Sequence, residues 1–160
     1  MPGNRDPIRL SLVEKVFRQY LQVTRTFWKD AETRAAKIIP DWKAALGDGF
    51  AQQLILIDRQ ALRFGHLIAT DEFVDPQLSL NDITERLAQD WSDADEKSLI
   101  ATNPVYREVV QQQETISVRW KPNAVSRSAL ETLQLDPKYA KARDTLAEKV
   151  SKLSDTLAQS

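Results

Sequence analysis

Apolar side chains recur every three to four residues over most of this chain, and this spacing constrains the fold more than any other feature of the sequence. Near the N-terminus the repeat runs through Val13, Val16, Phe17, Tyr20, Thr24, Phe27, Ala31, Ala35 and Ile38. Side chains at this spacing lie on one face of an α-helix, whereas a half-buried strand alternates at every second residue. The sequence therefore predicts an all-α fold.

The first helix is predicted to be long and to span residues 11–39. Ser11 and Glu14 have the spacing of a capping box, in which both side chains bond free amides of the first turn, and Asp6-Pro7 is a competing start. Pro40 ends the helix because it disfavours helical geometry at the residue before it. About 28 residues would give a helix of about 42 Å, a length that favours a bundle backbone or a seam between subunits.

The rest of the chain is expected to add shorter helices, giving an irregular single-domain bundle of about five to seven helices. Pro40 would open a short helix that ends at Gly47, with Asp48-Gly49 as a turn. A helix over 50–69 has a broad apolar face, which predicts burial on most sides; a buried strand at 54–57 is the alternative. The remaining helices are expected at 82–91 after Asn81, at 93–101, at 104–120, after a capping box at Ser128–Glu131, and from Asp136-Pro137 onward.

Length and composition indicate one ordinary globular domain. The 160 residues fit a single unit over 1–160, with 1–10 as a flexible N-terminal arm. The chain has no Cys, which excludes a disulfide scaffold, a cysteine-ligated metal and a thiol nucleophile. Its longest apolar run, Leu54–Ile57, is far shorter than a membrane span of ~20 residues, and Met1–Asp6 has no secretory signal core. We expect a soluble, cytoplasmic protein without membrane contact.

Charge is segregated along the chain although the total is nearly neutral, with 22 Lys and Arg against 23 Asp and Glu. Segment 71–96 holds nine acids and a single base, Arg86, which gives it a net charge of −8. The flanking parts of the chain are basic. Such an acidic segment could meet a basic partner, imitate nucleic acid, or pack on the protein's own basic helices.

Catalytic and cofactor motifs are missing from the sequence. His66 is the single histidine, and Asp58 lies eight residues before it, too far for contact along one helix. No phosphate-binding glycine loop, nucleophile elbow or paired-histidine metal motif occurs. We expect no cofactor and no metal and favour a non-enzymatic role. A ligand site or active site near His66 and Asp71 is the remaining enzymatic alternative.

One short stretch resembles a known repeat family. The motifs Asn103-Pro104 and Asp136-Pro137 lie 33 residues apart, and 133–142 resembles the seam between two tetratricopeptide repeats, which stack helical hairpins into peptide-binding surfaces. The residues that such repeats expect in their first helix have no match at Val109, Gln112 and Gln113. The alternative explanation is that Asp-Pro and Asn-Pro simply start helices well.

Taken together, these patterns favour a protein–protein interaction module: a subunit, adaptor or inhibitor that acts through a helical surface and the acidic segment. The residues expected to contact a partner are Trp28, Asp90, Asp93, Asp95 and Glu96. The partner would be another protein, for which a basic surface would suit the acids, and a second copy meeting along the long helices is left open.

A nucleic-acid-associated subunit is the main alternative. It would use bases near the C-terminus: Arg119, Lys121, Arg127, Lys138 and Lys141. Acidic residues interrupt this set, which makes nucleic acid the less favoured partner.

Overall fold

The computed structural model describes residues 7–70, 79–89 and 93–159, and within these ranges the chain forms helices and no strand. This confirms the predicted all-α fold and rules out the strand at 54–57. The described elements are α1 (Pro7–Ile38), the short π-helical segment η2 (Lys43–Gly47), α2 (Asp48–Ala69), α3 (Leu80–Gln89), α4 (Asp93–Thr102), α5 (Pro104–Arg119), α6 (Ala124–Leu135) and α7 (Pro137–Ala158).

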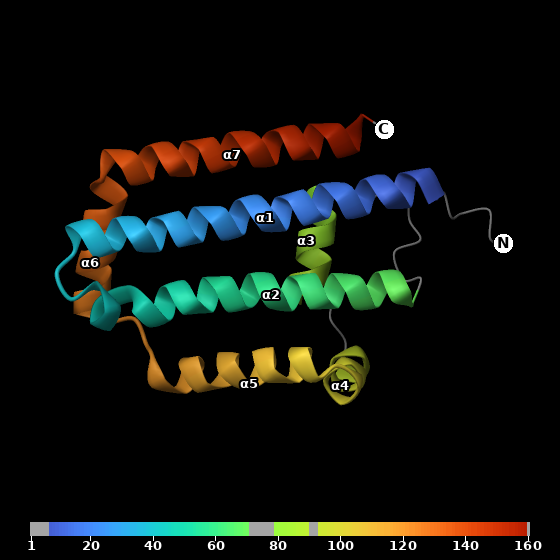
Figure 1. Cartoon of the computed structure of the whole chain (residues 1–160), viewed down its shortest axis with the longest axis horizontal. Coiled ribbons are helices and arrows are strands. Elements are labelled where there is room, and N and C mark those ends of the chain that lie inside the picture. The colour runs from blue at the N-terminus through green and yellow to red at the C-terminus, as the bar shows by residue number, and fades with distance from the viewer. Residues whose placement is uncertain (1–6, 71–78, 90–92, 160) are drawn as a thin grey trace.

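Four of the longer helices lie side by side in the order α7, α1, α2, α5 (Figure 1). The shorter α3 and α6 run across this row: α3 packs on α2 and α7, and α6 packs on η2, α7 and α1. The last short helix, α4, packs on α5 at one end of the row. Because α7 and α5 form the two outer members, the molecule has two different edges.

The first helix begins earlier than its capping-box pattern predicts. It starts at Pro7, so the competing Asp6-Pro7 start is correct, residues 7–10 belong to the helix, and Ser11 is an exposed residue inside it. Arg9 donates a hydrogen bond of 2.7 Å to the carbonyl of Leu157, which ties the start of α1 to the end of α7. The full 32 residues give a rod of about 48 Å.

The turn after α1 differs from the prediction. The predicted short helix does end at Gly47, as η2, but it begins at Lys43 rather than at Pro40. Asp48-Gly49 is not a turn but the first turn of α2, which continues directly from η2. The chain reverses instead at Asp41, whose φ of 54° is left-handed. Gly49 serves close packing: a Cβ there would lie 3.2 Å from the indole of Trp120. A glycine in a helix can thus mark a close approach rather than a turn.

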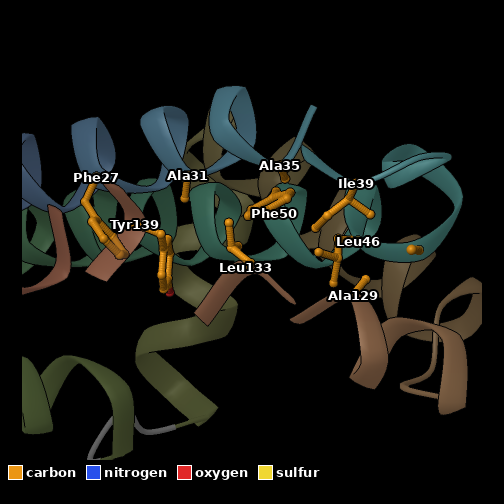
Figure 2. Packing of buried hydrophobic residues seen from close by; sticks show 10 residues of the cluster. Phe27, Ala31, Ala35, Ile39, Leu46, Phe50, Ala129, Leu133 and Tyr139 are labelled. Atoms are coloured by element: carbon orange, nitrogen blue, oxygen red, sulfur yellow. The ribbon is translucent and has the colours of Figure 1, made fainter. Parts of the chain in front are cut away.

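Two apolar clusters lie along the row and share the inner face of α1. One joins α1, α2, α3 and α7, and in it the rings of Phe17 and Phe64 stack with centroids 4.4 Å apart. The other, at the opposite end, brings side chains of α1, η2, α2, α6 and α7 toward one another (Figure 2). Its labelled members are Phe27, Ala31, Ala35, Ile39, Leu46, Phe50, Ala129, Leu133 and Tyr139. Together, the two clusters contain most of the periodic apolar positions from which α1 was predicted.

The starts of α5 and α7, which have Pro as their first residue, agree with the sequence, whereas the starts of α3 and α6 do not. Asn103 accepts hydrogen bonds from the amides of Val105 and Tyr106, as expected for the cap of α5. At α3 the cap is Ser79, which exchanges hydrogen bonds with Asp82, rather than Asn81.

At α6 the capping box is formed by Asn123 and Ser126, so the predicted start at Ser128 was wrong. A Ser-x-x-Glu spacing fits many helix interiors, and the Pro that precedes Asn123 decides the start here.

The two segments that resemble a repeat do not stack. In the structure α5 packs against α2 and α4, while α7 packs against α1 at the other edge of the row. Among the described residues, no helix is both long enough and apolar enough to cross a bilayer.

Candidate interaction surfaces

A polar network fastens the α4–α5 edge to α2. Arg59 and Arg63, one helical turn apart on α2, both donate to the Tyr106 hydroxyl, at 3.0 and 2.9 Å. That hydroxyl donates to the Glu96 carboxylate at 2.6 Å, and the two guanidinium groups bond the same carboxylate at 2.5 and 3.0 Å. Arg63 also donates to the carbonyl of Leu87 at 2.6 Å, which ties in α3.

This environment shifts the titration of its members. Burial acts to raise the pKa of Glu96, but the Tyr106 hydrogen bond and the positive charges of Arg59 and Arg63 outweigh it and hold that pKa below its usual range. Burial, together with the hydrogen bond to the ionised Glu96, raises the pKa of the Tyr106 hydroxyl. The network is therefore a closed ionic contact in which donors and acceptors are matched.

The acidic residues predicted to meet a partner have mixed placements. Glu96 is engaged by the protein's own arginines, the alternative that the sequence left open for it. Asp95 lies 3.9 Å from the Nε2 atom of His66. Asp90 lies outside the described residues, and Asp93 is described only as the first residue of α4. Partner binding through the acidic segment stays a prediction.

His66 lies beside a carboxylate of another helix and at an open depression. Its carboxylate neighbour is Asp95 of α4 rather than Asp58, which forms an ion pair with Arg25 of α1. An open depression of about 490 Å³ beside it includes the Thr102 hydroxyl, which donates to the carbonyl of Ser98. Asp71 lies outside the described residues. Within the described ranges, no three His, Cys, Asp or Glu side chains gather as a metal site.

Trp28 is half-buried and contributes to the packing of the molecule. Its ring lies edge-on to Phe27 at 5.1 Å and tilted against Phe50 at 6.4 Å. The structure therefore gives Trp28 an internal role, and its contact with a partner stays a prediction.

The five bases predicted for nucleic acid do not share one surface. Arg119 ends α5 and forms a two-bond ion pair with Asp48, at 3.0 and 2.6 Å. Lys121 and Arg127 lie exposed along the connection to α6 and on α6. Lys138 and Lys141 belong to α7, at the other edge of the row from α5 (Figure 1).

Lys138 and Lys141 border an open groove between α1 and α7. The groove has a volume of about 470 Å³. Its lining residues come from α1 and α7 alone: Gln22, Val23, Thr26, Phe27, Asp30, Lys138, Lys141, Ala142, Thr145, Leu146 and Lys149. We call this the α1–α7 groove.

The floor of the α1–α7 groove is apolar and its α7 rim is basic. Val23, Phe27, Ala142 and Leu146 are buried or half-buried, whereas the three lysines are exposed. At about 100° per residue, Lys138, Lys141 and Lys149 fall within about 80° of one another around α7. None of these lysines has an ion-pair partner within 4 Å among the described residues.

One carboxylate sets the position of α7 on α1. Asp136 caps α7 by accepting from the amide of Tyr139 at 3.0 Å, and it also accepts two hydrogen bonds of 2.8 Å from Arg34 of α1. The Arg34 hydrogen bond is the main cause that holds the pKa of Asp136 below its usual value. The N-terminus of α7 is therefore fixed to α1, and this fixes the position of the rim lysines that come after it.

Sequence reasoning found two of the three groove lysines among the C-terminal bases but not the groove itself. It also missed the network around Arg63, for which the available signal was a pair of arginines one turn apart in the most apolar helix. Comparison of the chain with protein-family models, curated proteins and solved structures finds no significant match.

Proposed function

We propose that this protein is a protein–protein interaction subunit that binds its partner in the α1–α7 groove. The observation that carries the proposal is one open groove that combines an apolar floor with three lysines that have no ion pair in the part of the chain that the structure describes. Half-buried apolar side chains at the bottom of a groove can receive the apolar face of a partner, and exposed cations beside them can select the charge of that partner.

The arrangement of helices supports an interaction role over a chemical one. The structure has an ionic cluster around Glu96, but its charged groups bond one another and thereby join α2, α4 and α5. The groove, in contrast, lies between two long helices whose relative position is fixed by Asp136 and Arg34. A rigid, preformed surface lowers the entropy cost of binding.

Photo-crosslinking at single positions in the producing cells tests the proposal. A photoreactive phenylalanine derivative at Gln22 or Thr26, which line the groove, is expected to crosslink a distinct protein. The same probe at Ser151 or Ser117, exposed positions that do not line this groove, serves as the matched control.

The variant Thr145→Trp sharpens the test because a bulky ring at this exposed lining position would fill the groove. Crosslinking at Gln22 should then disappear while the circular-dichroism spectrum stays helical. Equal crosslinking at all four probe positions, or none at the two groove positions, would show that the groove is not the interaction site.

The alternative of a nucleic-acid-associated subunit has weaker support. Its five bases divide between two edges of the molecule, and Arg119 is already paired with Asp48. Nucleic-acid binding needs several cations on one face, so the groove lysines alone would have to supply it.

A further inference from the structure

We infer that the segment bound in the α1–α7 groove is an acidic amphipathic α-helix of another protein. This inference rests on the proposed function and adds the secondary structure and charge of the bound segment. Three features of the groove lead to it: its apolar floor, its lysine rim and its all-helical walls.

The floor requires an apolar face on the partner. Val23, Phe27, Ala142 and Leu146 are the apolar lining residues that are buried or half-buried, so the floor of the groove is mainly carbon surface. A segment that covers this floor with apolar side chains gains the free energy of removing both surfaces from water. A fully polar peptide would instead leave its own groups without hydrogen-bond partners.

The rim requires negative charge on the partner. Three lysines border the groove along α7, and Asp30 is the single acid among the lining residues. Carboxylates on the side of the partner's apolar face that lies next to α7 would meet the lysines, whereas lysines placed there would be repelled. The groove thus indicates an acidic partner segment, whereas the acidic segment 71–96 suggests a basic partner.

The walls require the partner to satisfy its own backbone. Both walls are α-helices whose amide and carbonyl groups are bonded within the helix, so the groove has no free strand edge. An extended peptide laid there would lose water from its backbone without gaining new hydrogen bonds, whereas a helix brings its own. Lys138 to Lys149 covers about 16 Å, which matches about three helical turns of a partner.

Nucleic acid fits the same groove less well. Phosphates would meet the three lysines, but the apolar floor offers them nothing, and Asp30 lines the same groove. A phosphate chain gains most from an unbroken row of cations. The inference therefore commits to protein and leaves nucleic acid as an outcome of the test.

Fluorescence anisotropy with defined probes tests the inference. The first probe is an 18-residue helical peptide with leucines at i, i+3, i+4 and i+7 spacing flanked by glutamates. The second keeps the leucines and replaces every glutamate with lysine, the third keeps the glutamates and replaces the leucines with glutamine, and the fourth is a single-stranded oligonucleotide. We expect the full-length protein to bind the first peptide at least about tenfold more tightly than the other three at low salt.

The charge-reversed variant K138E/K141E/K149E should weaken binding of the first peptide at least about 30-fold, because three attractions become repulsions. The matched control K97E/R107E/K121E changes the net charge equally on exposed residues of α4, α5 and the connection after α5, and it should leave binding within about threefold. Thr145→Trp should abolish binding without any change of charge, whereas Ser151→Trp should not.

Several results would overturn the inference. They are no binding of the first peptide at low salt, equal binding of the lysine peptide, oligonucleotide binding that the triple variant removes, or self-association that the first peptide breaks. Success of the cell crosslinking with failure of the peptide assay would leave the interaction role standing and reject only the acidic helix. Failure of both would reject the groove as a binding site.

Discussion

The two edges of the helical row use charge in opposite ways. At the α4–α5 edge, Arg59 and Arg63 share Glu96 and Tyr106, so that the charges are matched inside the contact. At the α7 edge, the lysines of the α1–α7 groove have no such partners within the described residues. The first edge uses its charges in the contact itself, whereas the second is joined by apolar packing and the Arg34–Asp136 pair and leaves its three groove lysines available.

The most direct test of this comparison is to remove Arg63 from the network at the α4–α5 edge, which we call the closed edge; the α7 edge is the open edge. Arg63→Ala would leave Glu96, the Tyr106 hydroxyl and the Leu87 carbonyl without their shared donor in a buried position. We expect a loss of about 3–4 kcal/mol in the free energy of unfolding, measured by urea denaturation. A loss below about 1 kcal/mol would mean that water replaces the guanidinium and that the contact is not closed.

A smaller effect is expected from the apolar part of the same edge. Ile116 of α5 is buried in a small cluster with Ile55 and Val109. Ile116→Ala should cost about 2–3 kcal/mol, towards the low end for a core truncation because a thin cluster can partly collapse. Hydrogen exchange should accelerate in α5 and remain unchanged in α1 and α7; acceleration in all three would show that the edges unfold as one unit.

Acid should weaken the α4–α5 edge. Because the pKa of Glu96 is lowered in the fold, its ionised form contributes stability above the unfolded pKa of about 4.3, and this is lost as the pH falls through the lower folded pKa. Glu96→Gln should therefore cost about 2 kcal/mol at pH 7 and less near pH 3, because the stability that the wild-type carboxylate contributes declines once the pH is below its unfolded pKa. Urea unfolding at the two pH values measures this, and an equal cost at both would contradict the assignment.

The smallest effect on stability is expected at the open edge. The variant K138E/K141E/K149E should change the free energy of unfolding by less than about 0.5 kcal/mol, because these exposed lysines have no described ion pairs to lose. Its midpoint in urea, compared with that of K97E/R107E/K121E, provides the measurement. A large destabilisation would show that the lysines serve the fold rather than a partner.

The apolar period predicted the helices well because it reports burial, which the fold must satisfy along every helix. The predictions that failed, at Ser11, Asn81 and Ser128, relied on short capping patterns. Such a pattern fits many places in a helix, and neighbouring prolines and packing choose among them.

The surfaces were harder to predict because their members come from different helices. Glu96 and Arg63 lie 33 residues apart in sequence, and neither the apolar period nor a motif joins them. The groove likewise depends on the antiparallel pairing of α1 with α7, which helical period alone does not specify. Single residues such as Lys138 could be selected from the sequence, but the residues that lie beside them in the folded protein could not.

The double role of Asp136 has a consequence for how this surface can evolve. The same carboxylate caps α7 and forms an ion pair with Arg34 of α1. If α7 slid along α1, it would therefore lose either this ion pair or the hydrogen bond that caps its first turn. Inserting one residue just after Pro137 would rotate every later side chain by about 100° and carry Lys141 and Lys149 away from the floor. Point substitutions can therefore change the charge or shape of the groove step by step, whereas an insertion or deletion in this stretch would separate its lysine rim from its apolar floor in one step.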